Sequence, residues 1–237
     1  KGVNPIEDIK LMMRLAKIYR SLSADFIIHY TIKPNIYGSL AARYCNVPSL
    51  AITTGLGYTF VNEDIVTKIA HLLYKFSFKY PEDIWFLNED DRQAFLAYSL
   101  VSENKAKLLH GEGVNVSHFS PISSSSSNNP TTFLLVARML WDKGIGEYIE
   151  AARVIKSKYP ITHFQLLGAC DVPNPSLISR EQISAWESEG AVEYLGTADD
   201  VRAVIAKVDC VVLPSYREGI PRTMLEAAAM AKPLIVS

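Results

Sequence analysis

The chain has 237 residues, 49% of them hydrophobic and 21% charged, and its formal net charge is −1 at pH 7. This length can bury one large or two modest cores, and the balanced charge argues against wholesale binding of nucleic acid. The sequence contains no apolar run of about 18 residues and begins without the apolar core of a signal peptide, so we expect a soluble cytoplasmic protein that does not span a membrane.

The first half of the chain alternates helical and strand patterns. Its predicted strands are short apolar runs, whereas its predicted helices carry apolar residues at helical spacing. Such alternation is typical of a parallel sheet covered by helices. The expected helices span residues 5–21, 35–44 and 65–80, with another starting at 89, and the expected strands span 26–29, 49–53 and 84–87.

The predicted helix over residues 65–80 has two interpretations. It has an apolar arc suited to a core and a basic face flanked by Tyr74 and Phe78. Cations beside aromatic rings suit a lipid headgroup surface, but the same pattern also fits a core-packed helix with an ordinary solvated face. The arc consists of Ile65, Ile69, Leu72, Leu73 and Phe76, and the basic face of Lys68, His71, Lys75 and Lys79.

A polar segment over residues 119–131 divides the chain almost evenly. It contains five consecutive serines, Ser123 to Ser127, followed by two asparagines and a proline. A serine run of this kind has nothing to contribute to a core. We therefore expect a first domain over residues 1–118, a linker over 119–131 and a second domain over 132–237.

The second half shows the same alternation. Ligands of parallel α/β sheets bind beyond the carboxyl ends of the strands. Arg138, Gly168, Gly196 and Glu218 each follow a predicted strand, so we expect all four to face one crevice. The expected strands span 132–137, 163–167, 192–195, 209–213 and 234–236, and the expected helices span 144–158, 179–189, 199–207 and 222–231.

Two cations follow the strand over residues 132–137. Arg138 stands at its end, and Lys143 lies in the short loop before the next helix. Fixed positive charges there can stabilise the negative charge that grows on a departing diphosphate. Each cation, taken alone, also fits a solvated surface charge.

The segment over residues 213–230 joins a strand to a helix and carries two glutamates, Glu218 and Glu226, with seven residues between them. Pro221 suits the first helical position, and Gly219 leaves room for close approach of a ligand to the backbone. Amides at a helix start point at negative groups, so this junction is predicted to bind an anion. Glu226 would lie about 7 to 8 Å along the helix, where its carboxylate can accept hydrogen bonds from ribose hydroxyls.

The pattern Pro-Ser-x-x-Glu-Gly-x-Pro before the second glutamate, together with Arg138 and Lys143, resembles glycosyltransferase family 4 (group 1), which has the GT-B fold. The resemblance covers essentially all of the chain. It implies an α/β protein with two Rossmann-like parallel-sheet domains facing a cleft. The family's initial strands and its final strands and helices have no counterpart here, so the sequence is expected to be a fragment whose first domain is incomplete at its N-terminus.

The resemblance also implies roles for the residues at the strand ends. Glu218 would hold the donor sugar, and Arg138 and Lys143 would hold the diphosphate, which makes these three the expected catalytic residues. Glu226 would bind the ribose. The other expected donor contacts are Gly219, Ile220 and Pro221 at the sugar and phosphates, and Gly196 and Thr197 at the base.

Loops over residues 30–38 and 53–58 are expected to shape the acceptor site. Together with the segments over residues 88–92, 179–181 and 194–196, they are similar to those of the bacterial family members that build capsule and other polysaccharides on a polyprenyl-diphosphate lipid. Many family members have a histidine before the glycine that matches Gly55, and this chain has Thr54, so no role of that histidine is carried over. His29, at the end of an apolar strand, is expected to be structural. The expected acceptor-side residues are Lys33, Asn35, Thr54 and Gly55.

The implied activity is the retaining transfer of a hexose or N-acetylhexosamine from a UDP-sugar to a saccharide acceptor, expected to be linked to a polyprenyl-diphosphate lipid, at the inner face of the cytoplasmic membrane. No Asp-x-Asp motif is present, so we expect transfer without a metal or cofactor. Cys45, Cys170 and Cys210 lack metal-ligand or redox spacing and are expected to be reduced thiols. Two alternatives stay open: a nucleotide-sugar epimerase of the same architecture, and a non-catalytic nucleotide-sugar-binding module.

Overall fold

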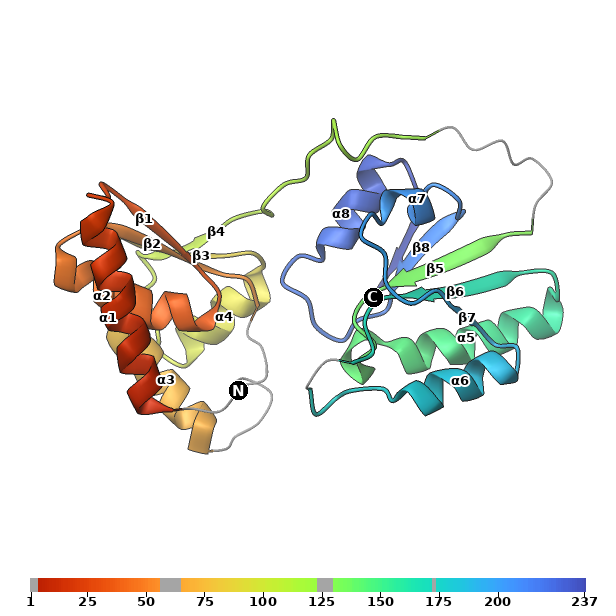
Figure 1. Ribbon diagram of the computed structural model, residues 1–237, viewed down its shortest axis with the longest axis horizontal. Helices are drawn as coiled ribbons and strands as arrows, with labels where there is room; N and C mark the ends of the chain where they lie inside the picture. The colour runs from red at the N-terminus through yellow and green to blue at the C-terminus, as the bar shows by residue number, and fades with distance from the viewer. Residues whose placement is uncertain (1–3, 56–64, 123–129, 172–173) are drawn as a thin grey trace. The chain divides into compact units, whose positions relative to one another are not determined.

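The computed structural model describes residues 4–55, 65–122, 130–171 and 174–237 (Figure 1). The chain forms two compact units, Lys1–Glu112 and Gly113–Ser237. The division falls before the predicted linker, which was expected to begin at Phe119. Phe119 instead packs against the core of the second unit. The serine run lies outside the described residues.

The first unit contains a four-stranded parallel sheet in the order β1-β2-β3-β4. Three of its strands were predicted from their apolar runs, and β4 was not. The strands are β1 (Ile27–Tyr30), β2 (Ser49–Thr53), β3 (Asp83–Phe86) and β4 (Ala106–Leu108).

The helices of the first unit begin and end close to the predicted positions. Asn4 caps the first of them, because its side chain accepts hydrogen bonds from the amides of Ile6 and Glu7. The predicted helix over residues 35–44 begins with one π-helical turn, Pro34–Gly38, before its α-helical part. The α-helices are α1 (Pro5–Ser21), α2 (Ser39–Cys45), α3 (Ile65–Ser77) and α4 (Glu89–Ala97).

Helix α3 packs through the face opposite to the predicted one. Tyr74 and the following Phe78 are buried in a cluster of aromatic rings with Phe86 and Phe95. Most of the apolar arc that was expected to pack is exposed instead: Ile65, Ile69, Leu72 and Phe76 are exposed by 43% to 74%, whereas Leu73 packs against the cluster. Tyr74 and Phe78 each bury a large ring in this core, which makes their face the one that packs.

The second unit contains a five-stranded parallel sheet in the order β7-β6-β5-β8-β9. Numbered by appearance within this unit, the order is 3-2-1-4-5, so it reverses between β5 and β8. Ligands of such sheets bind at the carboxyl ends of the strands where the order reverses. The strands are β5 (Thr132–Val136), β6 (His163–Leu167), β7 (Glu193–Tyr194), β8 (Cys210–Leu213) and β9 (Leu234–Val236).

Helices cover both faces of this sheet (Figure 1). One face packs against α5 (Ile145–Lys158) and α6 (Arg180–Ser188), and the other against α7 (Arg202–Ile205) and α8 (Arg222–Ala229). Helix α7 is shorter than the predicted span. Pro221 is the extended residue that precedes α8, rather than its first helical residue as predicted. Within the described parts of the chain, no helix is both long and apolar enough to cross a membrane.

Candidate functional site

The turn that follows β5 is pressed against the turn that follows β8. Gly144, at the start of α5, has a φ of +69°, and a Cβ atom there would lie 1.8 Å from the carbonyl oxygen of Pro214. Only glycine fits this left-handed position and this distance. The glycine therefore lets the two turns, which start from neighbouring strands, touch through their backbones.

Hydrogen bonds to one carbonyl group hold these two turns together. The carbonyl oxygen of Asp142 accepts from the backbone amide of Tyr216 and from the hydroxyl of Ser215, each at 3.1 Å. The Tyr216 hydroxyl also binds the carboxylate of Glu147 in the first turn of α5. The β8–α8 loop is therefore fixed relative to the segment that carries Lys143.

Lys143 and Glu218 meet across this junction. The Lys143 Nζ atom lies 2.5 Å from Glu218 Oε1, and the two side chains are only 18% and 25% exposed. Partial burial reduces the screening of such a pair by water. The two residues to which the sequence assigned the diphosphate and the donor sugar are thus in direct contact at the reversal point of the sheet.

Arg138 lies beyond the end of β5 and is exposed. The backbone on either side of it is fixed, because the Ala137 amide donates to the Leu167 carbonyl and the Met139 amide donates to the Ala169 carbonyl. Its side chain has no ion-pair partner among the residues that the structure describes. A cation held in this way is available to an anionic ligand.

The turns after β6 and β7 join the same edge. The Gly168 amide donates to the Gly196 carbonyl at 2.7 Å, and the Tyr194 hydroxyl donates to the Gly168 carbonyl at 2.7 Å. A Cβ at Gly168 would lie 1.8 Å from the Ala137 carbonyl. The backbones at three of the four predicted strand ends are thus in contact, and Thr197 follows as an exposed residue.

Glu226, the second glutamate, lines a pocket of about 420 Å³ in the second unit. Its side chain is 15% exposed. Burial raises the pKa of the Glu226 carboxyl, whereas the charges of Arg222 and His118 lower it. The other lining residues are His118, Phe119, Asp199, Asp200, Val201 and Arg202.

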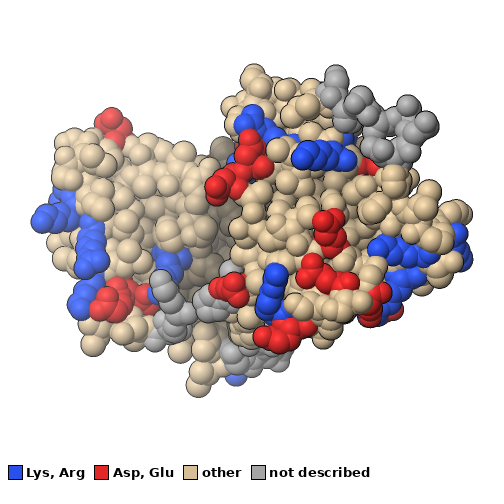
Figure 2. Space-filling model, turned by 45° about the vertical axis from the view of Figure 1, so that its right-hand side comes forward, with Lys and Arg blue, Asp and Glu red and all other residues tan. Residues whose placement is uncertain are grey.

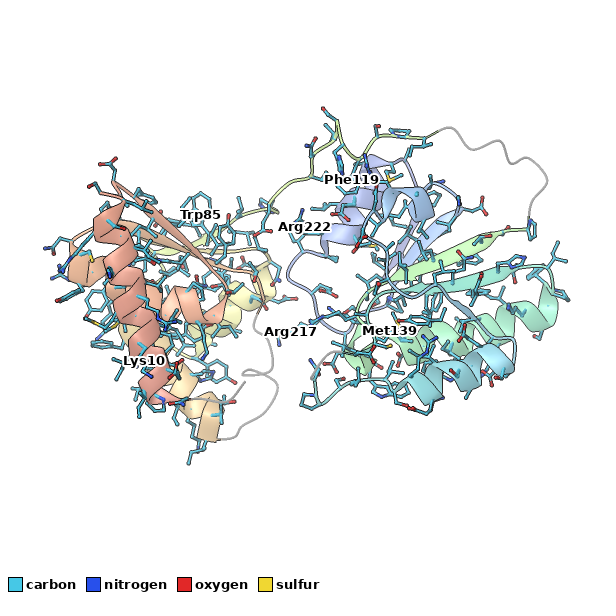
Figure 3. All side chains as sticks on the ribbon, in the orientation of Figure 1. Lys10, Trp85, Phe119, Met139, Arg217 and Arg222 are labelled. Atoms are coloured by element: carbon cyan, nitrogen blue, oxygen red, sulfur yellow. The ribbon has the colours of Figure 1, made fainter. Side chains whose placement is uncertain are left out.

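The lining of this pocket was not predicted from the sequence beyond Glu226. Gly196 and Thr197, the expected base contacts, precede the Asp199–Arg202 wall without forming part of it. Figure 3 shows Arg222 at the start of α8 and Arg217 on the preceding loop. Figure 2 shows acidic and basic side chains interspersed on the visible face.

The expected acceptor-side residues lie in the first unit, where two of them have structural contacts. Lys33 Nζ lies 2.6 Å from a carboxylate oxygen of Asp8, which is buried and also accepts from the Tyr37 hydroxyl. Asn35 is buried rather than open to a ligand, and its amide donates to the Ile52 carbonyl. Lys33 therefore links the start of the π-helical turn to α1, and Asn35 links this turn to β2. Thr54 and Gly55 follow β2 and are partly exposed.

His29 is a structural histidine, as expected. It is buried, and its Nε2 atom lies 3.0 Å from the Tyr19 hydroxyl. Burial lowers the pKa of His29 to about 4, so the ring is neutral at physiological pH. Gly38 packs against the ring so closely that a Cβ there would lie 2.5 Å from it.

Residues 130–237 match the family model described as "Glycosyl transferases group 1". The whole chain is 34% identical to the N,N'-diacetylbacillosaminyl-diphospho-undecaprenol alpha-1,3-N-acetylgalactosaminyltransferase of Campylobacter jejuni and 25% identical to the UDP-Gal:alpha-D-GlcNAc-diphosphoundecaprenol alpha-1,3-galactosyltransferase of Escherichia coli. It spans 65% and 64% of the lengths of these two relatives.

The fold is similar to that of HepE from Anabaena, whose crystal structure contains UDP. The TM-score is 0.75 at 18% sequence identity, over 96% of this chain and 63% of HepE. A sucrose-phosphate synthase from Thermosynechococcus elongatus gives the same TM-score over 100% of this chain and 62% of the synthase.

Proposed function

We propose that this chain is a group 1 glycosyl transferase, which binds a UDP-sugar and transfers its sugar to a saccharide linked to a polyprenyl diphosphate in bacterial polysaccharide synthesis. The transferred sugar is a hexose or N-acetylhexosamine, and its anomeric configuration is retained. Two relatives are named for such lipid-linked acceptors, and HepE was crystallised with UDP.

The contact between Lys143 and Glu218 is the observation that carries this proposal. It places a cation and a carboxylate at the reversal point of the sheet, beside the strand end that presents Arg138. Arg138 and Lys143 bind the diphosphate and stabilise the charge that grows on it as the bond to the sugar breaks. Glu218 accepts hydrogen bonds from hydroxyls of the donor sugar.

The backbone of the β8–α8 loop adds neutral donors to this site. Gly219 and Ile220 have amides close to the start of α8, where the helix dipole favours negative groups. Two side-chain cations and these amides supply the positive charge that a divalent ion provides in other transferases, so we propose that transfer proceeds without a metal.

The Glu226 pocket receives the nucleoside half of the donor. A volume of about 420 Å³ accommodates a nucleoside, and the buried carboxylate of Glu226 can accept hydrogen bonds from both ribose hydroxyls. These bonds favour the charged form of Glu226, against the effect of its burial.

Helix α3 gives the first unit a surface suited to a membrane that carries the acceptor. Its exposed face combines Leu72 and Phe76 with Lys68 and Lys75. Apolar side chains can enter the headgroup region while lysines bind anionic lipids. We propose that this face makes the peripheral contact with the membrane.

Calorimetric titration of UDP, GDP and ADP tests the nucleotide part of this proposal. UDP is expected to bind selectively, and Glu226→Ala is expected to abolish or strongly weaken that binding. Glu150→Ala, which removes an exposed glutamate of α5, serves as the matched control. Equal binding of the three nucleotides, or UDP binding that is as tight in Glu226→Ala as in the unaltered chain, would contradict the proposal.

The retention of anomeric configuration is tested on the glycosylated acceptor that the transfer produces. The anomeric configuration of the transferred sugar can be read from NMR coupling constants, with acceptor-dependent transfer as the expected reaction in the presence of EDTA. An inverted product would contradict the retaining mechanism, and free epimerised sugar without acceptor would indicate an epimerase.

A further inference from the structure

One wall of the Glu226 pocket comes from the segment that opens the second unit. His118 and Phe119 line the pocket together with Arg202 of α7 and Glu226 of α8. The Asn115 side chain shapes this segment, because its Oδ1 atom accepts hydrogen bonds from the amides of Ser117 and His118, each at 3.1 Å. Phe119, labelled in Figure 3, packs against the core cluster that includes residues of α7 and α8, and its ring meets the His118 ring edge to face at 4.9 Å.

Arg202, in α7, joins this segment to the rest of the unit. Its Nη1 atom donates to the His118 carbonyl oxygen at 3.2 Å. The other side of the same guanidinium group binds both carboxylate oxygens of Asp200, with distances of 2.6 to 3.1 Å. Hydrogen bonds from Arg202 hold the pKa of the Asp200 carboxyl at about 2, so the pair is charged at neutral pH.

The arrangement of Arg202 between Asp200 and the His118 carbonyl suits the positioning of the pocket wall better than the stabilisation of the fold. An exposed ion pair such as that of Arg202 with Asp200 contributes little to stability. Asp200 instead aims the planar guanidinium group, so that one N–H reaches a carbonyl 84 residues away in the sequence. A lysine has no planar fork and cannot hold both partners in this arrangement.

We propose that Arg202 is a positioning residue for donor binding, which holds the His118–Phe119 wall against the nucleoside half of the donor in the Glu226 pocket. This role rests on the proposed function, because it assigns the pocket to a nucleoside. A wall that is already ordered before the ligand arrives reduces the entropy lost on binding. Without the bond from Arg202, only the Asn115 side chain and the packing of Phe119 hold the segment, so more of its ordering occurs when the ligand binds.

The test compares Arg202→Ala and Arg202→Lys with the unaltered chain in titrations with uridine and with UDP. Arg202→Ala is expected to weaken both ligands by a similar factor, about tenfold, because both contain the nucleoside. Arg202→Lys keeps the charge and is expected to recover only part of the loss. If the alanine variant does not fold, the lysine variant carries the test, with a loss of about threefold expected for both ligands.

Arg153→Ala is the matched control. Arg153 also binds two carboxylates, those of Glu150 and Glu189, but it lies on the α5 and α6 side of the sheet. The control should bind both ligands as the unaltered chain does. Unchanged affinities in both Arg202 variants would overturn the inference, and so would a loss for UDP that is absent for uridine, since that pattern indicates a charge effect at the phosphates. If the unaltered chain binds no UDP, the proposed function itself fails.

Discussion

Replacing Glu218 with glutamine is expected to raise the affinity of the chain for free UDP while lowering sugar transfer. Lys143 Nζ lies 2.5 Å from Glu218 Oε1, so a diphosphate must compete with this carboxylate for the lysine. A partly buried pair of this kind is expected to contribute about 1 to 2 kcal/mol. In Glu218→Gln the ion pair is absent, so UDP binding no longer has to break it. The affinity for UDP is expected to rise about three- to tenfold.

Calorimetric titration of UDP measures this effect, and a double-mutant cycle with Lys143→Met assigns it. Lys143→Met alone should weaken UDP binding, and in its presence Glu218→Gln should have little further effect, because the competition no longer exists. Glu150→Gln makes the same charge change on an exposed part of α5 and is the control. An affinity for UDP that falls in Glu218→Gln, or that matches the control, would refute the competition between ligand and carboxylate.

Three further predictions concern the turns, the pocket and α3. In thermal melts, Gly144→Ala should lower the free energy of unfolding by about 2 to 4 kcal/mol. Gly190→Ala should cost clearly less, because Gly190 has a similar φ of +75° but open space around it. Equal costs would contradict the close contact of the turns. Burial raises the pKa of Glu226, so folding favours the protonated form of this carboxyl. The free energy of unfolding of the unaltered chain should therefore match that of Glu226→Gln at low pH and fall below it as the pH rises from 4 to 7. The opposite trend would refute the raised pKa of Glu226. Leu72→Glu combined with Lys75→Glu should lower the fraction of the protein that co-sediments with anionic vesicles. An unchanged fraction would exclude the exposed face of α3 as the membrane contact.

The sequence predicted most elements because their apolar patterns were clear. The strands over residues 49–53 and 163–167 have the predicted bounds, since the first is buried throughout and only the first residue of the second, His163, is exposed. Strand β4 was missed because it has three residues, Ala106–Leu108, of which one is a lysine. The prediction of the packing face of α3 was wrong because two faces of the helix are apolar. The packing of Tyr74 against the neighbouring aromatic rings decides between these faces, and the sequence does not show it.

The site was predictable to the level of strand ends but not to the level of contacts. Strand order brings Arg138 and Glu218 to one edge of a parallel sheet, which sequence patterns can indicate. The pairing of Lys143 with Glu218 depends on the backbone contact at Gly144, which no periodicity reveals. The wall at His118 was overlooked because it is built by a carbonyl group and an arginine far away in the sequence.

A crystal structure of this chain with UDP would test the central claim most directly. The account predicts the diphosphate within hydrogen-bonding distance of Arg138 and Lys143, with the Lys143 ammonium shared with or withdrawn from Glu218, and the ribose hydroxyls on the carboxylate of Glu226. UDP bound elsewhere on the second unit, or bound with its diphosphate away from both cations, would contradict it.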